Sequence, residues 1–329
     1  MRPIGARLRQ ADLVRIVVVG AGVAGLTAAR SLGARGHDVL VLDKGRSPGG
    51  RMATRRIGGA TIDHGAQFFT VRGDAFAAQV ASWQTDGVVR VWCHGFTNDG
   101  DGYPRYVGTR GMSAITKHMA AGLDVRCGAM VFAIRRAGTD RHGWDVVVDD
   151  GTVHRADAVV ATCPLPQTFS LLFEAGVDMP RTLVADDYER TLTLLAVLDG
   201  PSAVPSPGGV QQSDGIFSFV GDNAAKGISA VSAVTLHAGP AWSAEHWGDD
   251  RNAAHEALTD AARPWFGSAR LVDSQVKRWR FATPRTPWKD PCWIAPEGSL
   301  VVAGDAFAGP RVEGAYNSGL AAAAALAAS

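Results

Sequence analysis

The sequence predicts an α/β protein with two interleaved domains: a Rossmann-type domain with a parallel sheet, and a mixed layer of strands and helix. Two observations carry this prediction. Apolar, β-branched runs at 16–19, 157–162 and 300–303 are typical of parallel strands that are buried on both faces. Residues 167–291 instead show the alternation of antiparallel strands around one amphipathic helix. Because the apolar runs lie far apart in the chain, each domain is expected to be built from separate segments.

A glycine-rich turn follows the first strand. Gly20, Gly22 and Gly25 have the G-x-G-x-x-G spacing of a dinucleotide-binding turn. Gly20 permits the tight turn, Gly22 lets the backbone approach a pyrophosphate, and Gly25 lets the next helix pack on the strand. That helix is expected over 23–34, with the positive end of its dipole at the phosphates. The following strand ends in Asp43, whose carboxylate is placed to bind both hydroxyls of an adenosine ribose. The turn therefore predicts a bound dinucleotide, and leaves open whether it is FAD or NAD.

Composition excludes several classes of protein. The chain has 329 residues, of which 46% are hydrophobic and 20% charged, so it can bury a large core. Its net charge of +1 gives no electrostatic reason to expect nucleic acid or a membrane surface as a partner. No apolar run reaches the roughly 20 residues of a transmembrane helix, and the basic start of the chain lacks a secretion cleavage site. The four cysteines form no C-x-x-C pair, which predicts neither a metal site nor disulfides and suits the cytoplasm: Cys93, Cys127, Cys163 and Cys292.

The segment after Asp43 adds groups that suit a phosphate and a flat ring. Gly50 allows a tight backbone path, and Arg51 directly after it offers a guanidinium that matches phosphate oxygens. Gln67 can donate or accept a hydrogen bond at the edge of an isoalloxazine. His64, in the same run, is better interpreted as a structural hydrogen-bonding group than as an acid or base.

Later strand ends supply the rest of the predicted ligand contacts. Val131 lies where a strand can present backbone amide and carbonyl groups to an adenine edge. The strand at 157–162 returns the chain to the dinucleotide domain, and the prolines at 164 and 166 are expected to end it and begin an exit. Asp305, after Gly304 at the end of the last strand, puts a carboxylate at the hydroxyls of a flavin ribityl chain. A helix beginning at Val312 can direct its free amides at the pyrimidine carbonyl of a flavin.

Periodicity and turn residues predict the remaining elements. Helices are expected at 74–83, 113–121 and 250–266. Strands are expected at 39–42, 88–94, 123–127, 129–137, 144–149, 192–199, 216–220, 230–237 and 276–281, with two strand-like pieces around 63–67.

Several of these segments together resemble a known family. The glycine turn with Asp43, the Gly49–Gly50–Arg51 run and Gly304–Asp305 resemble the two-domain flavin amine-oxidase superfamily. More closely, GGRMATRR, DHGAQFFT, YVGTRGMSAI, VKRWRFATP and GDAFAGPRVEGAYNSG look like bacterial renalase-type flavoproteins. The resemblance implies a glutathione-reductase-like FAD domain from 12–73, 108–165 and 291–329, and a substrate domain from 74–107 and 166–290. Asp43 stands where such FAD proteins most often have the longer glutamate.

The resemblance also implies an activity and a set of contacts. It implies oxidation of the 2- and 6-dihydro isomers of NAD(P)H to NAD(P)+, with non-covalent FAD and with dioxygen reduced to hydrogen peroxide. FAD contacts are implied at Val23, Ala24, Asp43, Lys44, Arg51, Gln67, Phe68, Val131, Asp305 and Val312. Substrate contacts are implied at Phe69, Thr70, Val71, Arg72, Tyr106, Val107, Gly108 and Thr191.

No nucleophile–base pair or pair of acids stands out in the sequence. Hydride transfer from a dihydronicotinamide needs little acid–base help, so we assign no catalytic residue. Arg72, Arg105 and Arg110 either bind the substrate's phosphates or are solvated surface arginines. Two alternatives stay open: an amine or polyamine oxidase, and a flavin-binding regulatory protein without fast turnover. The first would need an aromatic cage, for which the candidates are Trp288, Trp293 and Tyr316.

Overall fold

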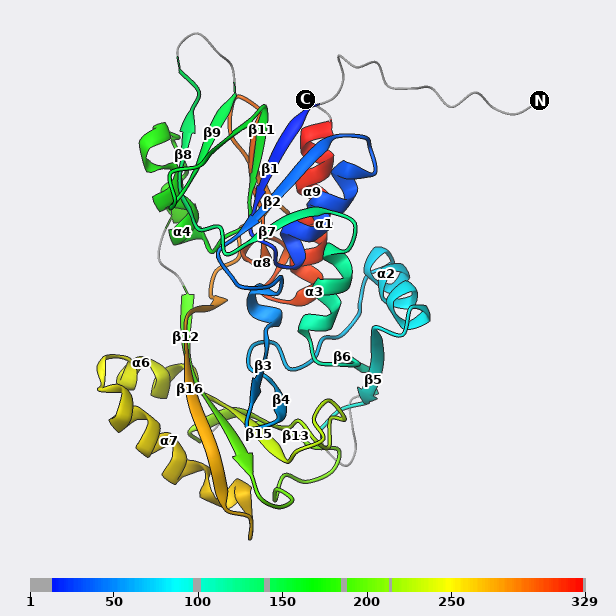
Figure 1. The fold of residues 1–329 in the computed structure, drawn as a ribbon, viewed down its shortest axis with the longest axis vertical. Coiled ribbons are helices and arrows are strands. Elements are labelled where there is room, and N and C mark those ends of the chain that lie inside the picture. The colour runs from blue at the N-terminus through cyan, green and yellow to red at the C-terminus, as the bar shows by residue number, and fades with distance from the viewer. Residues whose placement is uncertain (1–13, 97–101, 139–142, 185–187, 213–214, 328–329) are drawn as a thin grey trace, which may run out of the picture. The chain divides into compact units, whose positions relative to one another are not determined.

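The computed structural model describes residues 14–96, 102–138, 143–184, 188–212 and 215–327. The chain forms two compact units, each built from separate segments (Figure 1). The first unit comprises residues 1–50, 119–186 and 287–329, and the second comprises 51–118 and 187–286. These units differ from the expected domains at 51–73, 108–118, 166–186 and 287–290. The expected division into a FAD domain and a substrate domain stays a prediction.

A six-stranded sheet forms the centre of the first unit. Its order is β17-β18-β11-β1-β2-β7, and all neighbours except β17 and β18 pair in parallel. The three expected apolar runs become strands of this sheet, and the middle residues of β1 are fully buried. The strands are β1 (Arg15–Val19), β2 (Asp38–Asp43), β7 (Asp124–Cys127), β11 (Ala158–Ala161), β17 (Trp293–Ile294) and β18 (Leu300–Val302).

The strand order places a topological switch point beside β1. From β1 the chain runs through α1 (Val23–Gly33) to β2 on one side, and β11 pairs with β1 on the other. Ligands of such sheets bind outside the carboxyl ends of the strands at this point. Helix α9 (Val312–Ala327) packs against α1, where a Cβ on Gly319 would overlap the carbonyl oxygen of Ala24. The unit is completed by β8 (Val131–Arg136), β9 (Trp144–Val148), β10 (Val153–Ala156), α4 (Leu165–Leu172), α5 (Arg181–Val184) and α8 (Asp305–Ala308).

The second unit is built on a five-stranded antiparallel sheet in the order β13-β14-β15-β12-β16. The strands are β13 (Gly209–Gln211), β14 (Phe217–Asp222), β15 (Ala233–Ala238), β12 (Tyr188–Leu198) and β16 (Leu271–Pro284). Around it lie the hairpins β3 (Thr54–Ile57) with β4 (Ala60–Asp63) and β5 (Val89–Cys93) with β6 (Arg105–Gly108), and the helices α2 (Asp74–Thr85), α3 (Ser113–Ala120), α6 (Pro240–Glu245) and α7 (Arg251–Phe266).

Strand β12 is covered on both faces. Leu192, Leu194 and Ala196 pack in one apolar cluster with Leu258 of α7. The alternate residues Leu195 and Val197 pack in a second cluster, whose other members include Ile57, Ala60 and Ile62 of the β3–β4 hairpin. Successive side chains of a strand point to opposite faces, so helix and hairpin bury opposite sides of the same strand.

Four short helices in the described ranges were not expected: α4, α5, α6 and α8. Pro164 and Pro166 do end the strand β11, but they also begin helix α4. Proline suits the first turn of a helix, where its missing N–H would be unsatisfied anyway. Helix α6 begins at Pro240 for the same reason. No helix in the described ranges is both long and apolar enough to cross a membrane.

Candidate functional site

The glycine turn of the first unit has the geometry that the spacing predicts. Gly20 has φ +111°, a backbone conformation that favours glycine, and a Cβ there would press on the Thr162 hydroxyl. A Cβ on Gly25 would overlap the carbonyl oxygen of Gly20, so α1 can lie this close to β1 only with glycine at that position. The reasons given above for the first and third glycines are therefore confirmed.

Gly22 differs from its two neighbours in the motif. It has φ −84°, which any residue can adopt, and a Cβ on it would meet no atom within 4 Å. Folding alone therefore does not demand glycine here. Helix α1 begins at this residue with no capping side chain and no acid in its first turn. Its N-terminal amides and its dipole thus present positive potential beside an open backbone surface, which fits a pyrophosphate.

The carboxylate of Asp43 also holds the turn itself. One oxygen accepts a hydrogen bond from the Ala21 N–H at 2.6 Å, and the other accepts from the Gly45 N–H at 2.6 Å. A carboxylate offers about four acceptor sites, so two remain for ribose hydroxyls. Asp43 therefore ties the end of β2 to the glycine turn.

The second acidic strand end lies in the same unit. Gly304 has φ +148° and donates its N–H to the Ser318 hydroxyl at 2.8 Å, which fastens the turn to α9. Asp305 begins α8, and Val312 begins α9, whose first turn also carries Glu313. Val131 is the first residue of β8 and is buried. Lys44 is exposed and donates to the Gln167 side chain at 3.3 Å. The residues of this unit fit a flavin dinucleotide, and their contacts with one remain a prediction.

In the second unit, a buried polar network surrounds residues 63–69. The Lys226 ammonium lies 3.2 Å from an Asp63 carboxylate oxygen, and both side chains have 0% exposure. The same ammonium donates to the Gln67 side-chain oxygen at 2.9 Å and to the Gln67 backbone oxygen at 3.2 Å. Thr54 and the Met112 N–H donate to the other Asp63 oxygen. This network fixes the backbone of the segment that sequence assigns to the flavin ring.

The side-chain amide of Gln67 is hydrogen-bonded within the protein at both its nitrogen and its oxygen. Its amide nitrogen donates to the backbone oxygen of Asp63 at 2.7 Å, and its oxygen accepts from Lys226. Both N–H groups of the amide therefore have partners in the protein, at Asp63 and Gly65, and only the side-chain oxygen keeps an acceptor site for the expected hydrogen bond to an isoalloxazine. A flavin contact by Gln67 would go through its backbone or the edge of its side chain.

Two histidines beside this segment are neutral. Burial lowers the pKa of His237 to about 4, although its hydrogen bond to the Gly65 carbonyl opposes the shift. Burial, with Lys277 and Arg55 nearby, lowers the pKa of His64 to about 3. The His64 ring stacks on Trp279, and the Trp279 indole donates to the His64 carbonyl at 2.7 Å. The His64 ring thus packs by stacking, but its Nδ1 is buried without a hydrogen-bond partner among the described residues, so the structure does not show the hydrogen-bonding role that the sequence favoured for the side chain.

The expected substrate residues divide between core and surface. Phe69 is buried, stacks on Tyr106 and contacts Phe76 and Trp83. Val107 is fully buried and Phe69 is 4% exposed, so neither the side chain nor the backbone of Val107 is open to a substrate in this structure. Thr70, Val71, Tyr106 and Thr191 are half-buried, Gly108 is buried, and Arg72 and Arg110 are exposed. Their substrate contacts stay predictions.

An aromatic cluster was not foreseen. Phe68, expected at the flavin, packs on Phe96 with ring centroids 5.1 Å apart and on Phe219 at 5.9 Å. Trp92 packs on Phe96 at 5.1 Å. The Arg105 guanidinium lies over the Phe68 ring at 5.5 Å, and the Lys226 ammonium lies over the Trp92 ring at 5.3 Å. Arg105 is 8% exposed, so the interpretation of it as a solvated surface arginine is wrong. These residues come from distant segments: Trp92 from β5, Arg105 from β6, Phe219 from β14, and Phe68, Phe96 and Lys226 from the connections between elements.

The remaining candidates are Arg51, expected at the pyrophosphate, and the three aromatic residues considered for a cage. Arg51 is half-buried and donates to the Ala282 carbonyl at 3.3 Å. Of the proposed cage aromatics, Tyr316 is 8% exposed and belongs to the core. Trp288 and Trp293 are half-buried. Among the residues that the structure describes, no cluster of three or more His, Cys, Asp or Glu side chains could hold a metal ion.

A glycine turn with an acidic strand end, and a second Gly–Asp strand end on the same sheet, define a dinucleotide-binding protein of the oxidoreductase type. The chain belongs to the family of flavin-containing amine oxidoreductases, whose family profile matches residues 87–327. A profile described as an NAD(P)-binding Rossmann-like domain matches residues 18–83. The family implies a flavin, and the two-domain α/β fold predicted from the sequence is confirmed.

Similarity to individual proteins is local in sequence and extensive in fold. Hydroxyneurosporene desaturase of Rubrivivax gelatinosus is 53% identical over 58 residues, which are 18% of this chain and 11% of that protein. Lysine-specific histone demethylase 1 homolog 1 of Arabidopsis thaliana is 53% identical over 57 residues, 16% of this chain and 7% of that protein. A putrescine oxidase bound to putrescine has a TM-score of 0.67 at 16% identity and covers 96% of this chain and 99% of its own. An oxidoreductase from Methanosarcina mazei has a TM-score of 0.63 at 15% identity, with 93% and 99% covered.

Proposed function

We propose that this protein is an FAD-dependent oxidase that accepts a hydride from the 2- or 6-dihydro isomers of NAD(P)H. The products are NAD(P)+ and hydrogen peroxide: one dihydronicotinamide, one proton and one dioxygen are consumed, and two electrons pass from the substrate to oxygen. The proposal rests on the renalase-type motifs of the sequence, on the flavin that the family implies, and on the charge of the second unit's aromatic cluster.

The observation that carries the proposal over its rivals is the pair of cations on the aromatic cluster. Arg105 and Lys226 lie over the rings of Phe68 and Trp92, so these ring faces are already occupied by the protein's own cations and are not open to an ammonium substrate. Arg90, whose guanidinium donates to the Lys226 carbonyl, adds a third cation. The buried carboxylates Asp63 and Asp222 both act on Lys226. Cations already placed over these rings disfavour an ammonium there and favour an anionic substrate, such as one that carries phosphates.

The chemistry asks for positioning rather than for an acid or a base. When bound, the flavin supplies the hydride acceptor. The chain's own residues must hold the nicotinamide carbon about 3–3.5 Å from that acceptor. Lys226, Asp63 and Gln67 lock the backbone of 63–69, and the neutral His237 holds the Gly65 carbonyl at 3.0 Å. A neutral histidine pair and an ion-paired lysine fit a reaction in which no proton leaves the reacting carbon.

One experiment tests the proposal against both alternatives. Purified protein with FAD is mixed anaerobically with a 2- or 6-dihydro isomer of NAD, with putrescine, or with buffer, and flavin absorbance is followed. We expect rapid bleaching by the dihydro isomers only, and stoichiometric hydrogen peroxide once air is admitted. Fast bleaching by putrescine would instead support amine oxidation, which family membership keeps as the second candidate. Bleaching by neither, with flavin bound, would favour the regulatory protein.

A further inference from the structure

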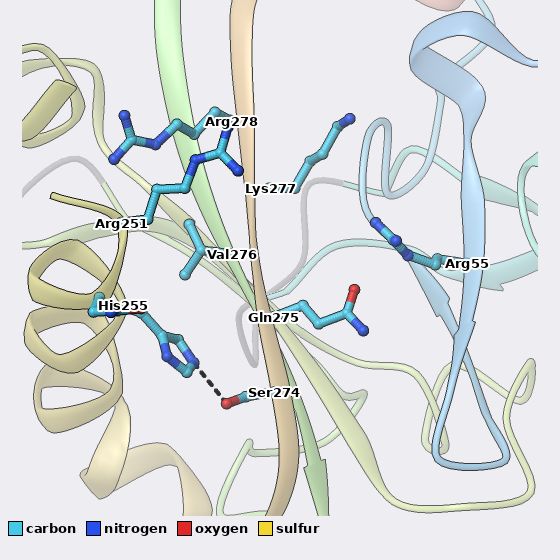
Figure 2. Close-up of a pocket in the computed structure, with 9 residues that line it drawn as sticks. Arg55, Arg251, His255, Ser274, Gln275, Val276, Lys277 and Arg278 are labelled. Atoms are coloured by element: carbon cyan, nitrogen blue, oxygen red, sulfur yellow. Dashed lines mark hydrogen bonds between the residues drawn. The ribbon is translucent and has the colours of Figure 1, made fainter. Parts of the chain in front are cut away.

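A pocket in the second unit collects positive charge without any acid in its lining. It has a volume of about 540 Å³ and is lined by nine residues (Figure 2). Four of them are cations and none is acidic, although the whole chain balances 33 basic against 32 acidic residues. The lining residues are Arg55, Arg251, Asn252, His255, Ser274, Gln275, Val276, Lys277 and Arg278.

The local fold explains why these residues meet. Arg251 and His255 are four residues apart on α7, so they share one helix face. Ser274, Val276 and Arg278 alternate along β16 and face α7, whereas Gln275 and Lys277 point to the other face, toward Arg55 of β3 (Figure 2). Within the described ranges, strand β16 ends the sheet and pairs with β12 alone. A pocket lined by residues of both its faces therefore lies at the edge of β16 that faces away from β12.

The arginines of this pocket are not neutralised by the protein. Arg55 and Arg251 make no side-chain hydrogen bond or ion pair with any residue inside the described ranges. Arg135, Arg263 and Arg270, by contrast, are exposed and paired with carboxylates. Arg278 donates to the carbonyls of Trp247 and Asp249, which orient its guanidinium without cancelling its charge.

Asp249 and Asp250, just before α7, bring carboxylates near the pocket, and that of Asp249 lies 2.6 Å from His246 Nδ1. Asp250, which precedes Arg251, accepts hydrogen bonds from the N–H groups of Asn252 and Ala253. These bonds, with Arg278 nearby, lower the pKa of the Asp250 carboxyl. It caps α7 and is not part of the lining. The pocket therefore keeps an excess of positive charge with polar groups between the cations, and His255 and Ser274 are held together at 2.7 Å.

We infer that this pocket binds the phosphate or diphosphate group of a nucleotide-sized ligand. Guanidinium groups match phosphate oxygens in a forked geometry, and three arginines and a lysine around one cavity suit several anionic oxygens rather than a single carboxylate. The volume lies within the roughly 300–1,000 Å³ typical of sites for such ligands. The dinucleotide of the proposed function and a separate phosphorylated metabolite share this chemistry, and the inference does not depend on the oxidase activity.

The test is calorimetric and needs no turnover. Holoprotein is titrated with inorganic pyrophosphate at constant ionic strength, kept with potassium chloride. We expect binding that Arg55→Gln and Arg251→Gln each weaken about tenfold. Arg56→Gln is the matched control, because Arg56 neighbours Arg55 on β3, is also exposed and does not line the pocket. Both pocket arginines are exposed, so the variants should unfold at the temperature of the parent protein.

Each outcome has a defined meaning. Loss of pyrophosphate binding in both pocket variants, but not in Arg56→Gln, supports the site. If NADP+ then competes with pyrophosphate and shows the same variant dependence, the ligand is the dinucleotide; if it does not compete, the ligand is a separate phosphorylated compound. Equal affinity in all four proteins overturns the inference. An absence of pyrophosphate binding in the parent protein also overturns the inference. If the pocket variants then self-associate, the role of these cations is to keep the edge strand β16 from pairing with another chain.

Discussion

The ammonium of Lys226 lies 3.2 Å from the carboxylate of Asp63, 163 residues away in the chain, and neither side chain is exposed. Burial lowers the pKa of Lys226, and the attraction of Asp63 opposes that shift. The pair also holds Gln67, and so the strand end that is predicted to face the flavin. Because this ion pair is buried, substituting its members tests how much it contributes to the stability of the second unit.

Lys226→Met is expected to destabilise the protein by about 3–5 kcal/mol, because it leaves the Asp63 carboxylate buried without its partner charge. The double variant Asp63→Asn/Lys226→Met should recover most of that loss, since it removes both charges. Lys289→Met, at an exposed lysine, is the control. Chemical denaturation measures the three free energies of unfolding. Equal stability of the single and double variants would contradict the prediction, because it would mean that the unpaired Asp63 carboxylate carries no cost.

Stability should fall as the pH is lowered from 6.5 to 4, because of His237. Its pKa is about 4 in the folded protein and 6.5 in the unfolded chain, so the unfolded chain binds more protons between these values. The stabilising contribution is complete above pH 6.5 and is lost as the pH falls toward 4. It is on the order of 3 kcal/mol. The free energy of unfolding, measured at several pH values, should therefore change less steeply with pH in His237→Gln than in the parent protein. His94→Gln, at an exposed histidine, should keep the slope of the parent protein.

Gly22→Ala separates ligand binding from folding. No atom lies within 4 Å of the added Cβ and φ is −84°, so the flavin-free protein should lose no more than about 1 kcal/mol. Flavin affinity should fall about tenfold or more, because the methyl group occupies the surface offered to the pyrophosphate. Gly25→Ala should do the opposite and destabilise the protein itself by about 1–3 kcal/mol, since its Cβ meets the Gly20 carbonyl. Thermal unfolding and flavin fluorescence titration distinguish the two, and an unchanged flavin affinity in Gly22→Ala would contradict the assignment.

Arg105→Gln should weaken the use of an anionic substrate. The guanidinium lies over Phe68 and Phe96, at 5.5 and 5.7 Å, and places a cation on that cluster. We expect KM for a dihydro-NAD isomer to rise about tenfold with a smaller change in kcat, and Arg105→Lys to restore part of the loss. Steady-state kinetics at two salt concentrations measures this, with Arg56→Gln as the control. A fall in KM for putrescine in Arg105→Gln, without any change for the dihydro isomer, would point to amine chemistry.

Much of the first unit could be predicted because its signals are local. The glycine turn, Asp43 and the helix at 23–33 lie within one short stretch, and the first and third glycines have steric reasons that the spacing already states. Helix α7 was predicted within one residue at its N-terminus for a similar reason, since Asp250 caps it. The strand β16 was predicted too short, because its ends are held by pairing with β12 and not by an apolar pattern of their own.

The sequence by itself determined the dinucleotide turn, the buried parallel strands and the class of cofactor, because those depend on backbone conformation and on residues close together in the chain. Tertiary structure alone decided that Gln67 is turned inward to Lys226, that Arg105 covers Phe68, and that β12 is buried on both faces. These depend on contacts between residues more than thirty positions apart in the sequence. A local sequence pattern does not indicate which distant charged or aromatic side chain will contact a given residue. Those contacts depend on how the strands pair and on the cost of burying a charge without a partner.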